Sequence, residues 1–125
     1  MRRLGALEAS VMEELWVAHG PLAVRDVLDR LQHDRAIAYT TVLTVLDNLH
    51  GKGLVARAKH GRAYRYTATL SREEHTAGLL DDVLAGDPNR GAALLHFVEH
   101  LSEDDVAELK AAIAALDQAD REGQG

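Results

Sequence analysis

Three helical patterns of apolar residues occupy the first part of the chain. They cover residues 5–18, 22–33 and 39–50, and in each of them apolar side chains recur at the spacing of one helix face. A Gly-Pro pair at residues 20–21 stops the first pattern. The third pattern ends at residues 51–53, Gly-Lys-Gly, where a glycine is available for a left-handed helix cap. These residues therefore predict three consecutive helices.

Two short alternating segments follow, at residues 54–59 and 63–69. They contain Val, Tyr and Thr, which favour strands. The residues between them, 60–62 (His-Gly-Arg), include the glycine that a tight hairpin needs. Residues 1–70 therefore predict three helices followed by a β-hairpin. A first short strand before the third helix would fit this order, although no pattern in the sequence marks it.

Residues 71–125 return to helical patterns. Residues 71–74, Ser-Arg-Glu-Glu, have the spacing of a capping box, and residues 87–88, Asp-Pro, place a capping residue before a proline at a predicted helix start. The last predicted helix begins at residues 102–105, and its apolar positions cover too few heptads to indicate a coiled coil. Residues 120–125 are expected to fray. The predicted fold class is therefore mainly α with a small β-hairpin wing.

The third predicted helix has two contrasting faces on a helical wheel. One face is apolar and is expected to be buried: Val42, Val45, Leu46 and Leu49. The opposite face is polar and carries no lysine or arginine: Thr40, Thr41, Thr44, Asp47 and Asn48. Threonine is a mediocre helix former, so helix propensity does not explain three of them on one solvated face. In the major groove of DNA, however, threonine can contact base edges, phosphates and the thymine methyl group.

An ordinary exposed face with some β-branched residues would also give this pattern. The surroundings favour DNA, because a second helix precedes this one and a basic hairpin follows it, which is the order of a winged helix-turn-helix. Four cations lie on or beside the hairpin, with His60 at its tip: Arg57, Lys59, Arg62 and Arg65. Such a wing can hold phosphates while the helix reads bases.

Composition and charge are compatible with this interpretation. The chain has 125 residues, a formal net charge of −6 and no cysteine, which excludes disulfides and thiolate chemistry. Residues 1–70 carry ten Lys or Arg against seven Asp or Glu, whereas residues 71–125 carry four against thirteen. The basic half permits local contact with phosphates, although two independent solvated surfaces would give the same counts. Because the sequence shows no membrane-spanning run and no signal peptide, the expected location is the cytoplasm.

The chain resembles the penicillinase repressor family of bacterial winged-helix regulators (the BlaI/MecI type) from about Leu4 to about Leu116. An ordered set of residues carries the resemblance: Leu7-Glu8, Met12, Leu15-Trp16, Tyr39 to Leu46, Leu49, Lys52 to Val55, Arg62 to Tyr66, Phe97-Val98 and Leu109. The resemblance implies a winged-helix domain at residues 1–70 that binds an operator in double-stranded DNA. It also implies a helical dimerisation domain at residues 71–125.

The threonines of the third helix and the arginines of the wing match family positions. On this resemblance we expect Thr41 and Thr44, helped by Thr40, to read bases. The residues expected to hold phosphates are Tyr39, Lys52, Arg57, Lys59, Arg62 and Arg65. Asn48 stands where many members carry arginine, and Gly51 often aligns with lysine. Both departures weaken phosphate contact.

The apolar content of the second half also indicates a homodimer. About 50 residues of helix do not readily enclose the following side chains alone: Leu79, Leu80, Val83, Leu94, Phe97, Leu101, Val106, Leu109 and Ile113. Burial of one such side chain stabilises by about 1.5–3 kcal/mol, so a two-fold partner is expected. Packing back onto the winged helix is the alternative. A two-fold dimer predicts a palindromic operator.

The resemblance also implies a route to release. In the family, a membrane sensor-protease system relieves repression by cutting the dimerisation part at an Asn-Phe bond. The corresponding bond here is His96–Phe97, in which Phe97 agrees with the family and His96 differs. Separation of the subunits would remove the affinity gained by linking two DNA-binding modules. A membrane sensor metallopeptidase is thus an implied partner, in the regulation of antibiotic resistance, while the chain itself is not expected to enter the membrane.

One motif points to a different class of protein. Residues 96–100 match the H-x-x-E-H pattern of one class of zinc peptidase, in which two histidines share a metal. Both histidines fall away from the apolar stripe, only carboxylates remain as a third ligand, and little chain is left for a substrate cleft. We therefore predict no enzymatic activity, metal site or cofactor. The predicted function is a homodimeric, sequence-specific DNA-binding repressor; the alternative is a winged-helix protein-interaction module, which would not need a basic hairpin.

Overall fold

The computed structural model describes residues 4–32 and 36–123. Its elements, in chain order, are α1 (Ala6–Val17), β1 (Leu22–Ala23), α2 (Val24–Leu31), α3 (Tyr39–Gly51), β2 (Val55–His60), β3 (Ala63–Ala68), α4 (Arg72–Ala85), α5 (Arg90–Glu99) and α6 (Glu103–Gly123). The chain forms two compact units, one ending at Asp81 and the other beginning at Asp82, within α4. The functional boundary expected after residue 70 lies between β3 and α4 and remains a prediction.

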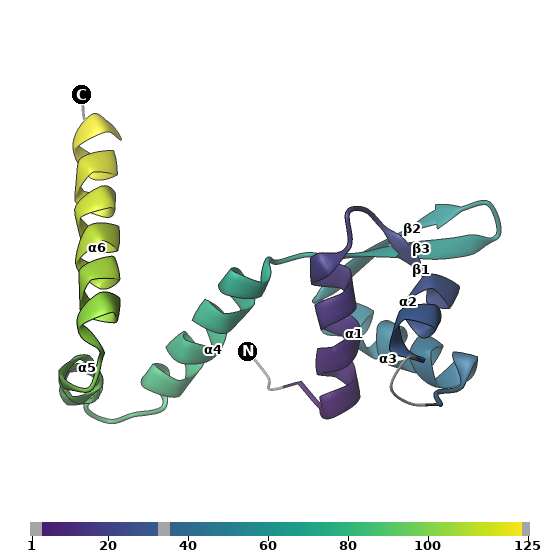
Figure 1. The fold of residues 1–125 in the computed structure, drawn as a ribbon, viewed down its shortest axis with the longest axis horizontal. Coiled ribbons are helices and arrows are strands. Elements are labelled where there is room, and N and C mark those ends of the chain that lie inside the picture. Colours follow the sequence, from purple (N-terminus) through teal and green to yellow (C-terminus); the bar gives the residue numbers. More distant parts are fainter. Residues whose placement is uncertain (1–3, 33–35, 124–125) are drawn as a thin grey trace. The chain divides into compact units, whose positions relative to one another are not determined.

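The first unit combines α1, α2, α3 and most of α4 with a three-stranded antiparallel sheet of order β1-β3-β2 (Figure 1). A short strand was expected before the third helix, although no pattern in the sequence marks it. β1 does precede α3, and it lies directly ahead of α2, where Leu22 pairs with Tyr66 and Ala23 with Arg65. The second predicted helix accordingly begins at Val24 rather than at residue 22. Two residues are too few to show an alternating pattern, so the pairing with β3 is what defines this strand.

The predicted hairpin is confirmed, with β2 and β3 paired from Val55 opposite Ala68 to His60 opposite Ala63. This register leaves a two-residue loop that begins with Gly61, whose φ of 66° is a conformation that favours glycine. Gly53 has a φ of 77° directly after the last residue of α3 and its cap, Lys52. The left-handed glycine predicted at the end of the third helix is therefore also present.

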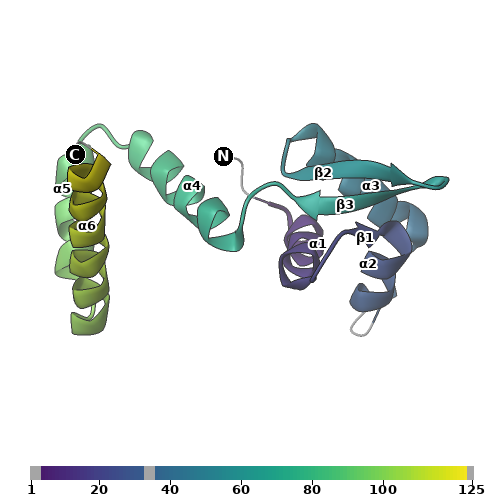
Figure 2. The ribbon, with the colours of Figure 1, turned by 90° about the horizontal axis from the view of Figure 1, so that it is seen from above.

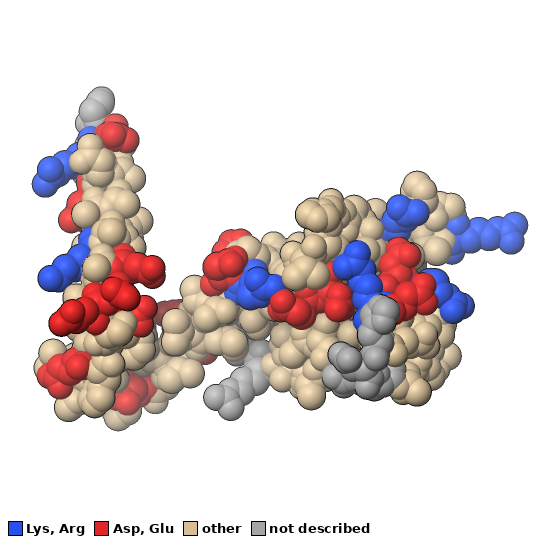
Figure 3. Space-filling model, viewed as in Figure 1, with Lys and Arg blue, Asp and Glu red and all other residues tan. Residues whose placement is uncertain are grey.

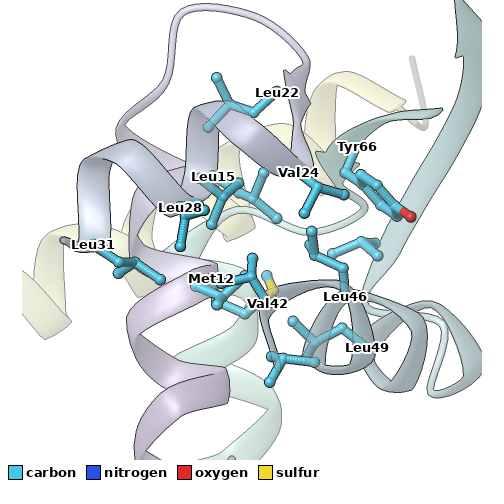
Figure 4. Packing of buried hydrophobic residues seen from close by; sticks show 14 of the residues in the cluster. Met12, Leu15, Leu22, Val24, Leu28, Leu31, Val42, Leu46, Leu49 and Tyr66 are labelled. Atoms are coloured by element: carbon cyan, nitrogen blue, oxygen red, sulfur yellow. The ribbon is translucent and has the colours of Figure 1, made fainter. Parts of the chain in front are cut away.

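The hydrophobic core gathers side chains from α1, α2, α3 and the sheet (Figure 4). The apolar face predicted for the third helix is buried, with Val42, Leu46 and Leu49 at 0% exposure and Val45 at 9%. Tyr66 of β3 is 1% exposed and reaches from the sheet to the helices. Burial of one face of α3 fixes which of its residues face outward.

The start of α4 attaches to α1 through side chains around the single tryptophan. Trp16 Nε1 donates a hydrogen bond to the carbonyl of Leu70 at 2.9 Å, and its ring lies 5.5 Å from that of His75, which is 5% exposed. Arg72 lies over the same indole and pairs with Glu13. These contacts belong entirely to the first unit.

The capping box predicted at residues 71–74 is present at the start of α4. Glu74 N donates to Ser71 Oγ, and Ser71 N donates to Glu74 Oε1, both at 3.0 Å. The bond from the Ser71 backbone amide is the main cause that lowers the pKa of the Glu74 carboxyl. Two otherwise unsatisfied donors at this helix end are thereby paired.

The second unit contains α5 and α6, drawn in green to yellow in Figure 2. The helix start predicted at residues 87–88 is wrong, because Asp87 Oδ1 accepts from Asn89 N at 2.7 Å and so forms a turn ahead of the helix. Asn89 caps α5 by accepting from Ala92 N at 3.1 Å. Ser102 caps α6 as predicted, with its Oγ accepting from Asp105 N at 3.1 Å.

The last helix runs further than the sequence suggested. Fraying was expected from residue 120, but α6 continues to Gly123, and residues 124–125 lie outside the described part of the chain. The bond from Gln118 Nε2 to Glu122 Oε1, at 3.4 Å, and Arg121 near the negative end of the helix dipole both support this last turn. Over the described residues, no helix is both long and apolar enough to cross a membrane.

The core account predicts that Leu46→Ala lowers the free energy of unfolding of the first unit by about 2–5 kcal/mol, because a fully buried leucine leaves a cavity. Urea unfolding followed by Trp16 fluorescence measures this, since the only tryptophan lies in that unit. Val17→Ala, at a residue that is 49% exposed, is the control and is expected to change stability by about 0.5 kcal/mol or less. Equal midpoints for Leu46→Ala and the unmodified chain would contradict the account.

Candidate nucleic-acid interface

The outer face of α3 is exposed along its length. All five residues that the helical wheel placed opposite the core are exposed: Thr40, Thr41, Thr44, Asp47 and Asn48. The same helix is held from behind by its buried apolar face, which packs in the core with α1 and α2. The structure therefore presents a row of short polar side chains on a helix whose rotation is fixed.

Thr44 has a constrained hydroxyl group. Its Oγ1 donates to the backbone carbonyl of Thr40 at 2.9 Å, so its hydrogen is already used within the helix. The oxygen can still accept a hydrogen bond, and the methyl group can still make apolar contact. Thr41 differs, because its hydroxyl makes no hydrogen bond to any residue in the described part of the chain. The two threonines thus offer different contacts to a surface in front of α3.

Three of the predicted phosphate-binding cations extend from the wing. Lys59, Arg62 and Arg65 are exposed on β2, the turn and β3, and none of them pairs with a carboxylate among the described residues. Figure 3 shows Lys and Arg side chains projecting at the turn end of this hairpin. These cations are available to an external anion.

Two other predicted cations are engaged inside the unit. Arg57 Nη1 lies 3.1 Å from Asp47 Oδ1, and its guanidinium lies over the ring of Tyr64, 4.4 Å from the ring centroid. Lys52 Nζ donates to Glu8 Oε2 at 2.7 Å, and this bond is the main cause that holds the pKa of the Glu8 carboxyl below its ordinary value. Both cations face a competing carboxylate that sequence spacing did not reveal.

Tyr39, the first residue of α3, is 42% exposed. An arginine that was not among the predicted phosphate-binding residues lies beside it. The guanidinium carbon of Arg25, in α2, lies 5.4 Å from the centroid of the Tyr39 ring. Nothing in the spacing of residues 25 and 39 indicates this contact, because it depends on how α2 and α3 cross.

Most of the predicted dimerisation residues are exposed, and none of them is buried. Over the described residues, α5 and α6 contain no buried residue at all. Six of the predicted residues are exposed, at 39–68%: Leu80, Val83, Leu94, Phe97, Leu109 and Ile113. The remaining three are half-buried: Leu79, Leu101 and Val106.

The H-x-x-E-H segment lies on α5 and its end. The His96 side chain is 74% exposed, with Nδ1 3.6 Å from Glu99 Oε2, while His100 Nδ1 lies 2.8 Å from the carbonyl oxygen of His96. In residues 4–32 and 36–123 no three His, Cys, Asp or Glu side chains gather where they could hold a metal ion. The bond between His96 and Phe97 lies in the same helix, and Phe97 is 54% exposed.

Comparison with known proteins gives consistent matches over the chain. The family model described as the penicillinase repressor matches residues 4–115. The transcriptional regulator BlaI of Mycobacterium tuberculosis is 43% identical over 120 residues, which cover 94% of this chain and 87% of that protein. An uncharacterised 16.5 kDa protein of Latilactobacillus sakei is 30% identical over 112 residues, covering 86% of this chain and 76% of that protein.

Solved structures agree on the fold. The solution structure of the DNA-binding domain of the repressor BlaI has a TM-score of 0.51 and 25% identity, and it covers 58% of this chain and 87% of that domain. An ArsR-like transcriptional regulator from Rhodococcus sp. RHA1 shares the fold, with a TM-score of 0.51 at 24% identity over 78% of this chain and 86% of that one. The chain therefore belongs to the penicillinase repressor family and is a winged-helix transcriptional regulator of the BlaI type.

Proposed function

We propose that the chain is a homodimeric repressor that places α3 in the major groove of an operator and its β2–β3 wing on the DNA backbone. One observation carries this proposal: the exposed threonine face of α3 lies in the same unit as a wing whose Lys59, Arg62 and Arg65 have no carboxylate partner among the described residues. A groove-reading helix needs short polar contacts, and a backbone contact needs unpaired cations.

The contacts divide between two kinds of residue. Thr41 and Thr44, with Thr40, read base edges. Phosphates are held by Tyr39, Lys59, Arg62 and Arg65. Lys52 and Arg57 join them when a phosphate replaces Glu8 or Asp47 as the ion-pair partner. An exposed ion pair contributes little free energy, so such an exchange costs little.

The second unit supplies the dimer contact. Its exposed apolar side chains, which include Phe97 and Ile113, are what a two-fold interface would cover. A two-fold dimer presents two copies of α3 and so requires a palindromic operator with half-sites about one helical turn, or a multiple of it, apart. Linking two weak modules raises the affinity of the second through its effective concentration.

Release follows from separation of the two subunits. We place the family's cleavage position at the bond between His96 and Phe97, which lies within the proposed interface and on a helix without buried residues. A membrane sensor metallopeptidase is the proposed source of the signal. Cutting this helix would divide the dimer contact and return each winged helix to its weaker affinity as a single module.

Thr44→Ala is expected to weaken binding to a duplex selected from a random pool by the unmodified protein, by about 1–3 kcal/mol, and to leave binding to random duplex nearly unchanged. Fluorescence anisotropy with labelled duplexes measures both affinities. The Thr44 hydroxyl already donates its hydrogen to the backbone carbonyl of Thr40 and so cannot donate it to a base. The side-chain methyl group is therefore the expected contact, with a thymine methyl group. Thr44→Val keeps this methyl group and should lose less affinity than Thr44→Ser, which removes it.

The control for this series is Thr76→Ala. Thr76 is also exposed and also donates to a carbonyl four residues earlier, Arg72, at 3.0 Å, but it lies on α4. It should not affect either affinity. Equal losses on selected and random duplexes for Thr44→Ala would argue against base reading by this residue.

Arg62→Ala is expected to weaken binding to selected and random duplexes alike, because the contact is with phosphate. It should also make the slope of log affinity against log salt concentration about one unit shallower for each half-site, and so about two units shallower for the dimer. Affinity titrations at several salt concentrations give this slope, with Lys110→Ala on α6 as a matched loss of one positive charge. An unchanged slope for Arg62→Ala would remove Arg62 from the interface.

Ile113→Asp is expected to convert the dimer to monomer, because it places a charge in the apolar seam of α6, where Ile113 is 52% exposed. Ala111→Asp adds the same charge on the opposite side of that helix and should leave the dimer intact. Sedimentation equilibrium gives the mass of both variants. A monomeric unmodified chain would overturn the dimer proposal. It would favour the alternative, in which these side chains pack onto the winged helix of the same chain.

A further inference from the structure

A small hollow lies between the start of α2, the first turn of α3 and the wing. Its volume is about 280 Å³, and Arg25, Tyr39, Arg62 and Tyr64 are among the residues that line it. These residues come from three separate stretches of the sequence. Two guanidinium groups and two tyrosine rings therefore converge on one place that the sequence did not indicate.

The sheet pairing brings the two arginines together. Leu22 opposite Tyr66 and Ala23 opposite Arg65 fix the end of β1 against β3, and the antiparallel direction carries the chain from there toward the hairpin turn. Arg25 follows β1 by two residues, while Arg62 lies in that turn. The buried side chain of Tyr66, 1% exposed, anchors this part of β3 in the core. The backbone on one side of the hollow is thus anchored in the core.

Neither arginine is neutralised. Arg25 and Arg62 are exposed, and neither pairs with a carboxylate in the described ranges. The carboxylate next in sequence, Asp26, accepts from the backbone N–H of Ala23 at 2.9 Å and so caps α2. The contact between Arg25 and the Tyr39 ring, at 5.4 Å, holds the guanidinium beside the start of α3 without using its hydrogen-bond donors.

The start of α3, whose first residue lines the hollow, has unpaired backbone donors. Ala38 precedes the helix and makes no side-chain cap, and its carbonyl accepts from Thr41 N and Val42 N. The N–H groups of Tyr39 and Thr40 have no acceptor among the described residues. Unpaired N–H groups at a helix start favour an anion. Tyr39, which begins this helix, lines the hollow together with Arg25 and Arg62.

We propose that this hollow binds one phosphate of the DNA backbone, with Arg25 and Arg62 as its two cationic contacts and Tyr39 positioning Arg25. The inference rests on the proposed DNA binding and adds a residue and a shared contact to it. Small-molecule pockets usually measure about 300–1,000 Å³, so this hollow suits a single group of a larger ligand better than a free effector. A phosphate held at the first turn of α3 would fix how far that helix enters the groove.

The test combines variants with a phosphate scan. The full-length protein is titrated with a duplex selected from a random pool and with copies in which single phosphates are replaced by uncharged methylphosphonate. Arg25→Ala is expected to weaken binding to the intact duplex by about tenfold or more, as for a lost charge-assisted hydrogen bond. Arg25→Lys should recover only part of this, because a lysine lacks the planar fork.

The scan identifies the shared phosphate. The unmodified protein should lose affinity when one particular phosphate in each half-site is neutralised. Arg25→Ala and Arg62→Ala should each bind that neutralised duplex almost as tightly as they bind the intact duplex, because the contact with this phosphate is already lost. Arg30→Ala, on the same helix but paired with Glu14 at 3.8 Å, is the matched control and should bind and respond as the unmodified protein does. Unchanged Trp16 unfolding midpoints confirm that the variants are folded.

Two results would overturn the inference while leaving the proposed function intact. In one, Arg25→Ala binds as tightly as Arg30→Ala while Thr44→Ala is weakened. In the other, Arg25→Ala remains fully sensitive to every neutralised phosphate. If instead the unmodified protein selects no duplex at all, the proposed function itself fails.

Discussion

The burial of one face of α3 is the constraint on which the rest of the structure depends. Val42, Leu46 and Leu49 are fully enclosed, and each such side chain stabilises the fold by about 1.5–3 kcal/mol. Turning the helix about its axis to hide the threonines would expose these residues. The core therefore determines which residues meet a partner. Tyr66 extends the same constraint to the wing, because it joins β3 to the core formed by the helices.

Charge pairing then sorts the cations of the first unit into two groups. Arg57 pairs with Asp47 and so links the wing to α3, while Lys52 pairs with Glu8 and links the end of α3 to α1. The unpaired cations of the wing, together with Arg25, remain for an external anion. A basic sequence segment is thus only partly a binding surface. Residues 82–125, which form the second unit, carry ten Asp or Glu against three Lys or Arg, and this acidic excess disfavours contact with DNA.

Periodicity was enough to predict most of the fold, because local patterns define helices, caps and the hairpin. The outward position of Thr41 and Thr44 followed from the wheel alone. What the sequence did not reveal depends on contacts between distant segments: the two-residue strand at Leu22, the ion pairs that engage Arg57, and the place of Arg25 beside the start of α3. The start of α5 was also misplaced, because Asp87 forms a turn and Asn89 caps the helix instead. The sequence predicted which side chains are buried or exposed more reliably than it predicted which residues they contact.

In the proposed complex, the exposed face of α3 enters DNA while the wing holds the DNA backbone. Amide chemical shifts of the ¹⁵N-labelled chain, recorded as a selected duplex is added, test it most directly. The account predicts the largest changes at Thr40, Thr41 and Thr44 and along the hairpin turn, with small changes at the buried residues behind them. Chemical-shift changes confined to α5 and α6, with none in α3 or the hairpin, would contradict this complex.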